Sequence, residues 1–251
     1  GGREAGLQWG WAAGILVSVL LAAAAYWFTA RGEVYSTRTA EQRSIRLADG
    51  SRVTLGARSR ITLHFSGEAR RIRLDSGEAY FEVARDPARQ FTVKAGESEV
   101  RFLGTAFNVR TNRDRILVSV TEGRVAVAAA GADKGTNAAE ARNGQTVICA
   151  GQQTVVTREG AIEPPAPAPA EVTWLQGRFE YRGEALRHVV DDLNRYTDRP
   201  ILFANAAAGG LRYTGTVFPD RLEEWLQGIG GALPVVVRNT GRRWEIHLAG
   251  E

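Results

Sequence analysis

The chain has 251 residues and a formal net charge of +4, with 32 basic and 28 acidic residues. Its basic side chains are interspersed with acidic ones, as where Arg71 and Arg73 stand beside Asp75 and Glu78, so they form no basic block of the kind that binds nucleic acid. Cys149 is the only cysteine, which excludes an intramolecular disulfide and a cysteine metal site. The chain contains no methionine, and we therefore expect the sequence to begin after a missing N-terminal region.

The first predicted element is a transmembrane helix within residues 1–33. No Asp, Glu, Lys or Arg occurs from Ala5 to Ala30, a stretch long enough to cross about 30 Å of hydrocarbon at about 1.5 Å per residue. Aromatic residues near both ends, such as Trp9 and Trp27, are typical of interfacial belts. The absence of charge predicts a membrane anchor.

A cleaved signal peptide is the alternative to this anchor. Ala22–Ala25 offers the small residues that signal peptidase prefers, whereas the apolar run continues through Tyr26–Phe28 and favours an uncleaved helix. The flanking charges do not fix the orientation, because Arg3 stands on one side and Arg31 on the other, and long domains translocate largely regardless of charge.

Residues 34–158 are predicted to form an all-β domain. Apolar residues alternate along the stretch, as in Ile61, Leu63 and Phe65, and turn residues such as Asp49-Gly50 separate the runs. No convincing amphipathic helix interrupts the pattern. The short strands imply a sandwich or a β-solenoid-like stack, and the sequence does not choose between them.

Four segments of this domain resemble the FecR domain. They are Ile45-Arg-Leu-Ala-Asp-Gly-Ser-Arg-Val-Thr-Leu55, Leu74-Asp-Ser-Gly-Glu-Ala-Tyr-Phe-Glu-Val83 with Asp86-Pro87 and Phe91-Thr-Val93 after it, Leu103-Gly-Thr-Ala-Phe-Asn-Val109, and Val120-Thr-Glu-Gly-Arg-Val125. One segment alone is a common β pattern, but four in the family's order identify the chain as similar to FecR-like proteins. The resemblance covers nearly everything from Ser44 onward.

Residues 159–172 are rich in proline and alanine and are predicted to be an extended linker. Beyond it, residues 173–251 are predicted to form a small βαβ-type α+β domain, because two stretches with helical spacing alternate with short apolar runs. The helices are expected at about 186–196 and 222–229, and the strands at 178–181, 201–203, 211–216, 235–238 and 244–248.

This C-terminal arrangement, with Phe179-Glu-Tyr-Arg-Gly-Glu-Ala-Leu186 before the first helix, resembles the short N-terminal domain of secretins and TonB-dependent transporters. Exposed strand edges in such a domain would suit pairing with another chain. We therefore expect partner binding within residues 173–251. The acidic pair Asp191-Asp192 is interpreted as a solvated helix face.

The sequence offers few catalytic candidates. His64, His188 and His247 have no partner at metal-ligand spacing, and we predict neither a metal nor a cofactor site. In Gly104-Thr105 a hydroxyl follows a glycine carbonyl, and the family resemblance implies that such a step can cleave itself. The alternative is that Gly104 is a strand bulge and Thr105 an ordinary strand residue.

The resemblance implies a signal transducer in the inner membrane with most of the chain in the periplasm. Its partners would be the signalling domain of a TonB-dependent transporter for an iron-siderophore or another scarce nutrient, and a cytoplasmic sigma factor held by the missing N-terminal region. The alternative is a docking component of an envelope secretin-type assembly.

Overall fold

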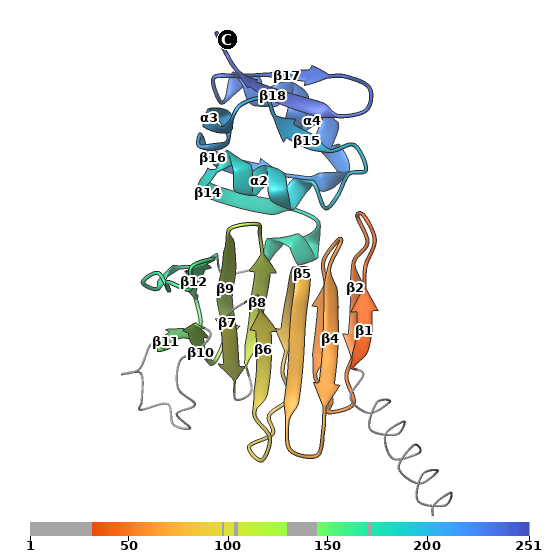
Figure 1. Cartoon of the computed structure of the whole chain (residues 1–251), viewed down its shortest axis with the longest axis vertical. Helices are drawn as coiled ribbons and strands as arrows, with labels where there is room; N and C mark the ends of the chain where they lie inside the picture. The colour runs from red at the N-terminus through yellow and green to blue at the C-terminus, as the bar shows by residue number, and fades with distance from the viewer. Residues whose placement is uncertain (1–31, 97, 103–104, 130–144, 170–171, 251) are drawn as a thin grey trace, which may run out of the picture.

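The computed structural model describes residues 32–96, 98–102, 105–129, 145–169 and 172–250. It contains two hydrophobic cores, one built from residues 45–156 and one from residues 174–246, and the two domains are stacked along the long axis (Figure 1). The predicted membrane segment, Ala5–Ala30, lies outside the described residues. Within the described part, no helix combines the length and hydropathy needed to span a bilayer.

The first domain is a 13-stranded sheet that curls on itself. Its strands are β1 (Glu33–Ser36), β2 (Arg43–Arg46), β3 (Arg52–Leu55), β4 (Arg60–Phe65), β5 (Arg70–Glu82), β6 (Phe91–Ala95), β7 (Ser98–Phe102), β8 (Ala106–Thr111), β9 (Arg115–Glu122), β10 (Arg124–Ala129), β11 (Gln145–Cys149), β12 (Gln152–Thr157) and β13 (Ala166–Pro167). The predicted mainly β class is therefore confirmed.

Strand β5 belongs to both halves of the sheet. Its first part pairs with β4 and β6, and its second part pairs with β3 and β8. Later hairpins extend the two halves in turn, so that β7, β10 and β11 continue one half and β9, β12 and β13 the other. One core lies between the two halves. There the ring of Phe81 stacks on that of Phe107, with 4.8 Å between the ring centroids, and lies edge-on to Phe91, with 6.3 Å between the centroids. The sequence did not choose between a β-sandwich and a β-solenoid-like stack. The structure has one sheet that folds over one core.

Gly77 is the residue at which β5 reverses. Its φ of +87° is in the left-handed region, and a Cβ atom here would lie 2.2 Å from the Ser59 Oγ atom, so only glycine fits. Ser59 fixes the bend because its Oγ accepts the Glu78 N–H and donates to the Glu78 carbonyl, both at 2.9 Å. As a result the Arg70 side chain at one end of β5 reaches the Ala84 carbonyl just beyond the other, at 3.0 Å.

Arg70 closes the domain at the end opposite the bend. Its side chain is fully buried, forms an ion pair with Asp49 at 2.8 Å and donates to the Arg89 carbonyl at 2.8 Å. Burial acts to raise the pKa of Asp49, but the hydrogen bonds from Arg70 and Ser51 hold it below its ordinary value. This contact ties the β2–β3 turn to the loop between β5 and β6.

The second domain has a two-stranded and a three-stranded sheet. Its elements are η1 (Thr173–Gln176, a 3-10 helix), β14 (Phe179–Ala185), α2 (Leu186–Leu193), β15 (Ile201–Phe203), α3 (Ala206–Gly209), β16 (Arg212–Val217), η2 (Pro219–Arg221), α4 (Leu222–Gly228), η3 (Ile229–Gly231), β17 (Val235–Asn239) and β18 (Trp244–Leu248). Strand β14 pairs with β16, while β18 pairs with β17 and, in parallel, with β15. The two predicted helices and five predicted strands are present. Helix α3 was not predicted, and it starts where the Asn205 side chain caps the Ala208 N–H at 3.0 Å.

The predicted linker, 159–172, is held against the first domain over much of its described length. The Glu163 N–H donates to the Val155 carbonyl at 2.8 Å, Ile162 packs on the first core, and β13 adds to β12 as an edge strand. Proline is tolerated there because an edge strand needs no N–H on its open side. The chain therefore enters η1 from a fixed position on the sheet.

We predict that Gly77→Ala lowers the free energy of unfolding of residues 32–251 by about 2–4 kcal/mol, because it adds both left-handed strain and a clash with Ser59. The measurement is urea denaturation. Gly67→Ala is the control, because a Cβ atom at Gly67 would meet nothing within 4 Å, and it should change stability by less than about 0.5 kcal/mol. Equal effects of the two substitutions would show that the bend is not a constraint.

Candidate functional site at the domain junction

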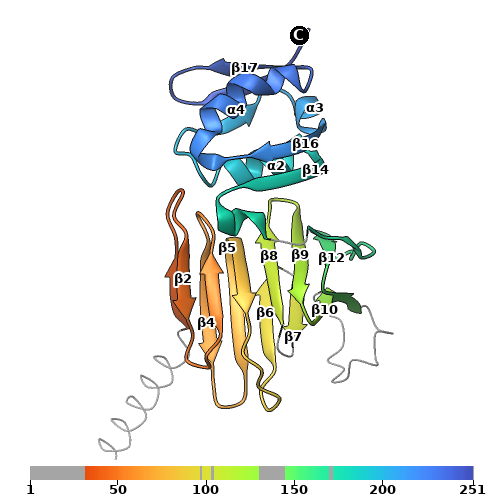
Figure 2. The same ribbon diagram turned by 180° about the vertical axis from the view of Figure 1, so that it is seen from behind.

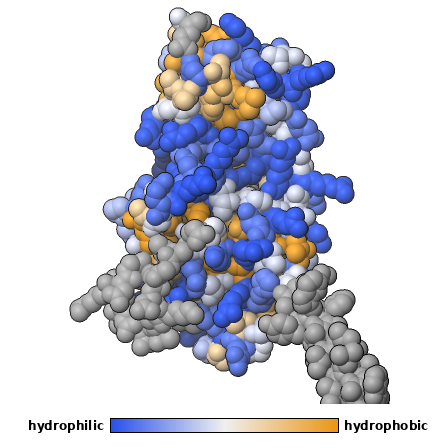
Figure 3. Space-filling model, viewed as in Figure 1, coloured by the Kyte–Doolittle hydropathy of each residue, from blue (hydrophilic) through white to orange (hydrophobic). Residues whose placement is uncertain are grey.

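The two domains meet at the end of the first domain that carries the β5 bend. Figure 2 shows α2, β14 and the turn before them lying over the upper ends of β5, β8 and β9. At the level of this junction the surface is mainly hydrophilic (Figure 3). Polar and charged side chains of both domains pair across this junction.

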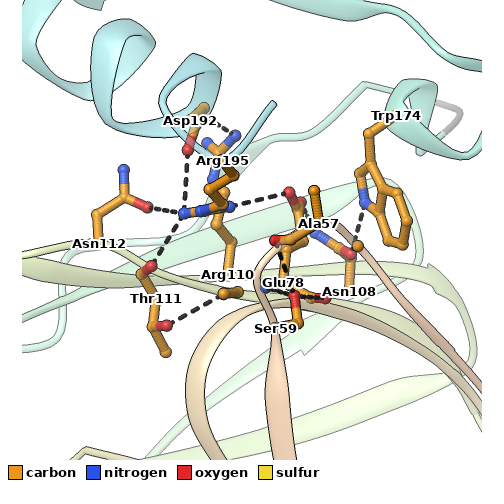
Figure 4. Close-up of polar contacts among 12 residues, drawn as sticks. Ala57, Ser59, Glu78, Asn108, Arg110, Thr111, Asn112, Trp174, Asp192 and Arg195 are labelled. Carbon is orange, nitrogen blue, oxygen red and sulfur yellow. Dashed lines mark hydrogen bonds and ion pairs between the residues drawn. The ribbon is translucent and has the colours of Figure 1, made fainter. Parts of the chain in front are cut away.

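Asp192 of α2 is the centre of the contact. Its side chain is fully buried, and its Oδ2 atom accepts from Arg110 Nη1 at 2.7 Å and from the Tyr181 hydroxyl at 3.2 Å (Figure 4). The Oδ1 atom lies 3.2 Å from Arg195 Nη2 in an ion pair. The interpretation of Asp192 as part of a solvated face is thus wrong, because an arginine of β8 pairs with it across the junction.

Glu78, the residue after the bend, is the second buried carboxylate. It accepts from Asn108 Nδ2 at 2.7 Å and forms an ion pair with Arg195 Nη1 at 3.5 Å. Asn108 in turn accepts from the indole N–H of Trp174 at 3.0 Å. The bend in β5 therefore places the Glu78 carboxylate in contact with Arg195 of the second domain.

Arg195 joins both carboxylates to the backbone of the first domain. Its Nη2 atom donates to the Thr111 carbonyl at 3.0 Å and to the Asn112 side-chain oxygen at 2.8 Å. Two guanidinium groups and two carboxylates thus share one buried site, which we call the junction cluster: Glu78, Arg110, Asp192 and Arg195.

The charges of the junction cluster depend on one another. Burial raises the pKa of Glu78, although Arg110 and Arg195 oppose the rise. Burial acts to lower the pKa of Arg110, but Asp192 and Glu78 hold it above its ordinary value. Removing one charge would therefore leave its partners buried without compensation.

A second group of charges lies beside the cluster around His188. This buried ring contacts Glu184 through Nδ1 at 2.8 Å and Asp114 through Nε2 at 3.1 Å, while Arg115 pairs with Glu184 at 2.8 Å. Burial acts to raise the pKa of Glu184, but the contacts with His188 and Arg115 lower it to about 2. His188 and Glu184 come from the second domain and Asp114 and Arg115 from the first, so this group also bridges the junction.

The junction also contains open space. A cleft of about 680 Å³ lies beneath α2 and is lined by residues of both domains, including Arg113, Arg158, Asp191 and Asn194. Within the described residues, no group of His, Cys, Asp and Glu is arranged to hold a metal ion. The polar groups here therefore join two domains across a partly open cleft.

The predicted cleavage step lies far from this junction. Gly104 is outside the described residues, while Thr105 is 5% exposed and its carbonyl accepts the Val83 N–H at 3.0 Å. The Thr105 Oγ1 atom is buried and has no hydrogen-bond partner among the described residues. Strand β8 starts directly after Thr105 and runs toward the junction, so the two sites lie at opposite ends of one strand.

We predict that Asp192→Asn lowers the free energy of unfolding by about 3 kcal/mol or more, because Arg110 and Arg195 would then share one buried carboxylate. Urea denaturation of residues 32–251 measures the loss. Glu245→Gln is the control, since its partly exposed carboxylate pairs with Arg243 and His247 near the surface, and the substitution should cost less than about 1 kcal/mol. A similar, small loss in both variants would contradict a structural role for the cluster.

The comparisons with known proteins agree with this architecture. Residues 33–126 match the family model described as FecR protein. Two crystal structures of a protein described as a "putative anti-sigma factor" from Parabacteroides distasonis ATCC 8503 have the same fold, each with a TM-score of 0.74. The first is 23% identical and aligns over 86% of this chain and 98% of its own, and the second is 24% identical over 85% and 98%. Among curated protein sequences, none matches. Residues 33–126, which make up most of the first domain, are thus similar to the FecR family, and we call the first domain the FecR domain.

Proposed function

We propose that this chain is a transmembrane signal transducer that regulates a sigma factor, with its C-terminal domain as the receiver and its FecR domain as the relay. The observation that carries the proposal is the junction cluster, since it couples α2 of the receiver to β5 and β8 of the relay through buried charges. The description of the structural neighbours as an anti-sigma factor supports the same role.

The proposed location is the inner membrane, with both domains in the periplasm. The charge-free segment Ala5–Ala30 supplies the anchor, and the FecR domain begins three residues after it, at β1. In this arrangement the receiver would meet the periplasmic signalling domain of a TonB-dependent outer-membrane transporter.

Strand β17 offers the edge at which that partner would pair. Within the described residues it is hydrogen-bonded to β18 on one side alone, and Val236, its second residue, is 48% exposed. A cavity of about 270 Å³ lies next to it, lined by residues of β17 and of the α4 region such as Leu226 and Gly230. An added strand gains backbone hydrogen bonds at the edge and can insert a side chain into the cavity. Figure 3 also shows an apolar patch on this domain near β15 and β18.

We expect Val236→Lys to weaken binding of the transporter signalling domain at least tenfold, because a lysine on an edge strand opposes strand addition. Isothermal titration calorimetry with residues 32–251 measures the change. Val147→Lys, an exposed valine on the β11 edge of the FecR domain, is the matched control and should bind as the wild type does. Titrating a secretin short N-terminal domain as well tests the alternative of a secretin-type assembly. No binding of any transporter signalling domain would reject the receiver role.

We also propose that the chain cleaves itself between Gly104 and Thr105. The Thr105 hydroxyl would attack the Gly104 carbonyl carbon, so that a C–O ester bond replaces the C–N peptide bond and the Thr105 amine is freed; water then hydrolyses the ester. The unpartnered Oγ1 atom of Thr105 supports this, because no described group competes for the hydroxyl. Pairing of β8 with β5 would keep the two fragments together.

Mass spectrometry of the expressed chain should therefore give two associated fragments divided at this step. Thr105→Ser should retain some cleavage because a hydroxyl remains, whereas Thr105→Ala should abolish it and leave the fold intact. Only intact wild-type chain, in cells and after purification, would reject self-cleavage. Equal cleavage in Thr105→Ala would instead implicate an outside protease.

A further inference from the structure

The end of the FecR domain opposite the junction carries four exposed arginines from separate segments. Arg46 ends β2, Arg71 follows the first residue of β5, Arg85 lies in the loop after β5, and Arg124 starts β10. We call this set the basal arginines. No ion pair among the described residues gives any of them a carboxylate partner, although most other arginines of the described chain have one.

The strand register brings the basal arginines to one end. Arg70, which precedes Arg71, is opposite Phe91; Phe91 is opposite Phe102; and Phe102 is opposite Val125, which follows Arg124. The buried Arg70 side chain also reaches the β2–β3 turn after Arg46 and the loop that contains Arg85, through Asp49 and the Ala84 carbonyl. The segments that carry Arg46, Arg71 and Arg85 therefore meet at the buried Arg70 contact, and the strand register places Arg124 at the same end.

Acidic groups at this end compensate the arginines only in part. Asp86 is paired with Arg89 at 2.8 Å, and Glu82 lies 3.9 Å from Arg52. Glu33, Glu68 and Glu122 are exposed acids near this end that have no ion pair among the described residues. Four unpaired cations against three unpaired anions leave a small excess of positive charge.

The chain enters the FecR domain at this same end. Gly32, Arg46 and Arg71 line one pocket of about 360 Å³ beside β1 and β4. The charge-free segment ends at Ala30, so two residues separate it from β1. An extended chain covers at most about 3.6 Å per residue, so the end of the segment lies within about 10 Å of this face. Electrostatic screening in physiological salt acts over about 8 Å, a similar distance.

We propose that the basal arginines bind the headgroups of anionic phospholipids. The inference rests on the proposed membrane anchor, which would hold this face at the bilayer surface. Arginine is suited to the task because its planar guanidinium donates two hydrogen bonds to one phosphate. Contact there sets the long axis of the molecule away from the bilayer and presents the C-terminal domain, at the far end, to its partner (Figure 1).

Vesicle sedimentation of residues 32–251 tests the proposal, because this fragment contains both cores and the junction cluster. Binding to phosphatidylcholine vesicles that contain phosphatidylglycerol should exceed binding to phosphatidylcholine alone. Arg46→Gln, Arg71→Gln, Arg85→Gln and Arg124→Gln together should weaken it at least tenfold. The control variant removes the same charge from the C-terminal domain by replacing Arg212, Arg221, Arg238 and Arg242 with glutamine, and it should bind as the wild type does.

Two outcomes would overturn the inference: no preference of the wild type for anionic vesicles, or equal losses in the two variants. Unfolding transitions of both variants establish that each is folded. A reporter fused after Glu251 reads the proposed topology separately, with activity expected only in the periplasm. A periplasmic reporter with no vesicle binding rejects the lipid contact alone, whereas a cytoplasmic reporter rejects the proposed anchor orientation.

Discussion

The reversal of β5 at Gly77 is the constraint on which the rest of the molecule depends. A strand that ran straight would pair with one set of neighbours and form an open sheet. Because β5 folds back, it pairs with β4 and β6 before the bend and with β3 and β8 after it, so both halves face a common core. The bend also leaves Glu78 at the top of the domain, where its buried carboxylate contacts Asn108 of its own domain and Arg195 of the second.

The junction contains buried ion pairs, and their burial limits how much they can stabilise it. Burying two carboxylates and two guanidiniums costs desolvation energy that their pairing only roughly repays, so such a cluster fixes geometry more than it adds stability. Each domain keeps its own apolar core, and an open cleft remains beneath α2. Separation of the domains would expose the charges of the junction cluster, which water can solvate, together with aromatic surface of Tyr80, which packs on the second core. An interface of this kind suits a relay whose two parts must hold one arrangement and still be able to leave it.

Local patterns in the sequence predicted most of the elements, though not α3, and they did not predict the junction. Alternation in β4 and helical spacing in α2 act within a few residues, and both elements were predicted. The burial of Asp192 depends on Arg110, which is 82 residues away, and no local pattern contains that distance. The glycine at position 77 indicated a turn. Its role in reversing β5 could not be predicted, because it depends on the contact with Ser59 and on the return of the chain to Ala84. One sequence signal could have indicated the junction. Asp192 is acidic, yet the helical spacing of α2 places it on the buried side of the helix.

Strand β8 connects the two ends of the FecR domain. It starts after Thr105, and its far end brings Asn108, Arg110 and Thr111 into contact with the C-terminal domain. Six residues of strand span about 20 Å, so a displacement of α2 would act on Arg110 and pull along the axis of β8. In an intact chain that pull is resisted by the covalent bond before Thr105. After the proposed cleavage it would be resisted only by the hydrogen bonds to β5 and β9, and β8 would then be the element that a displacement at the junction could move.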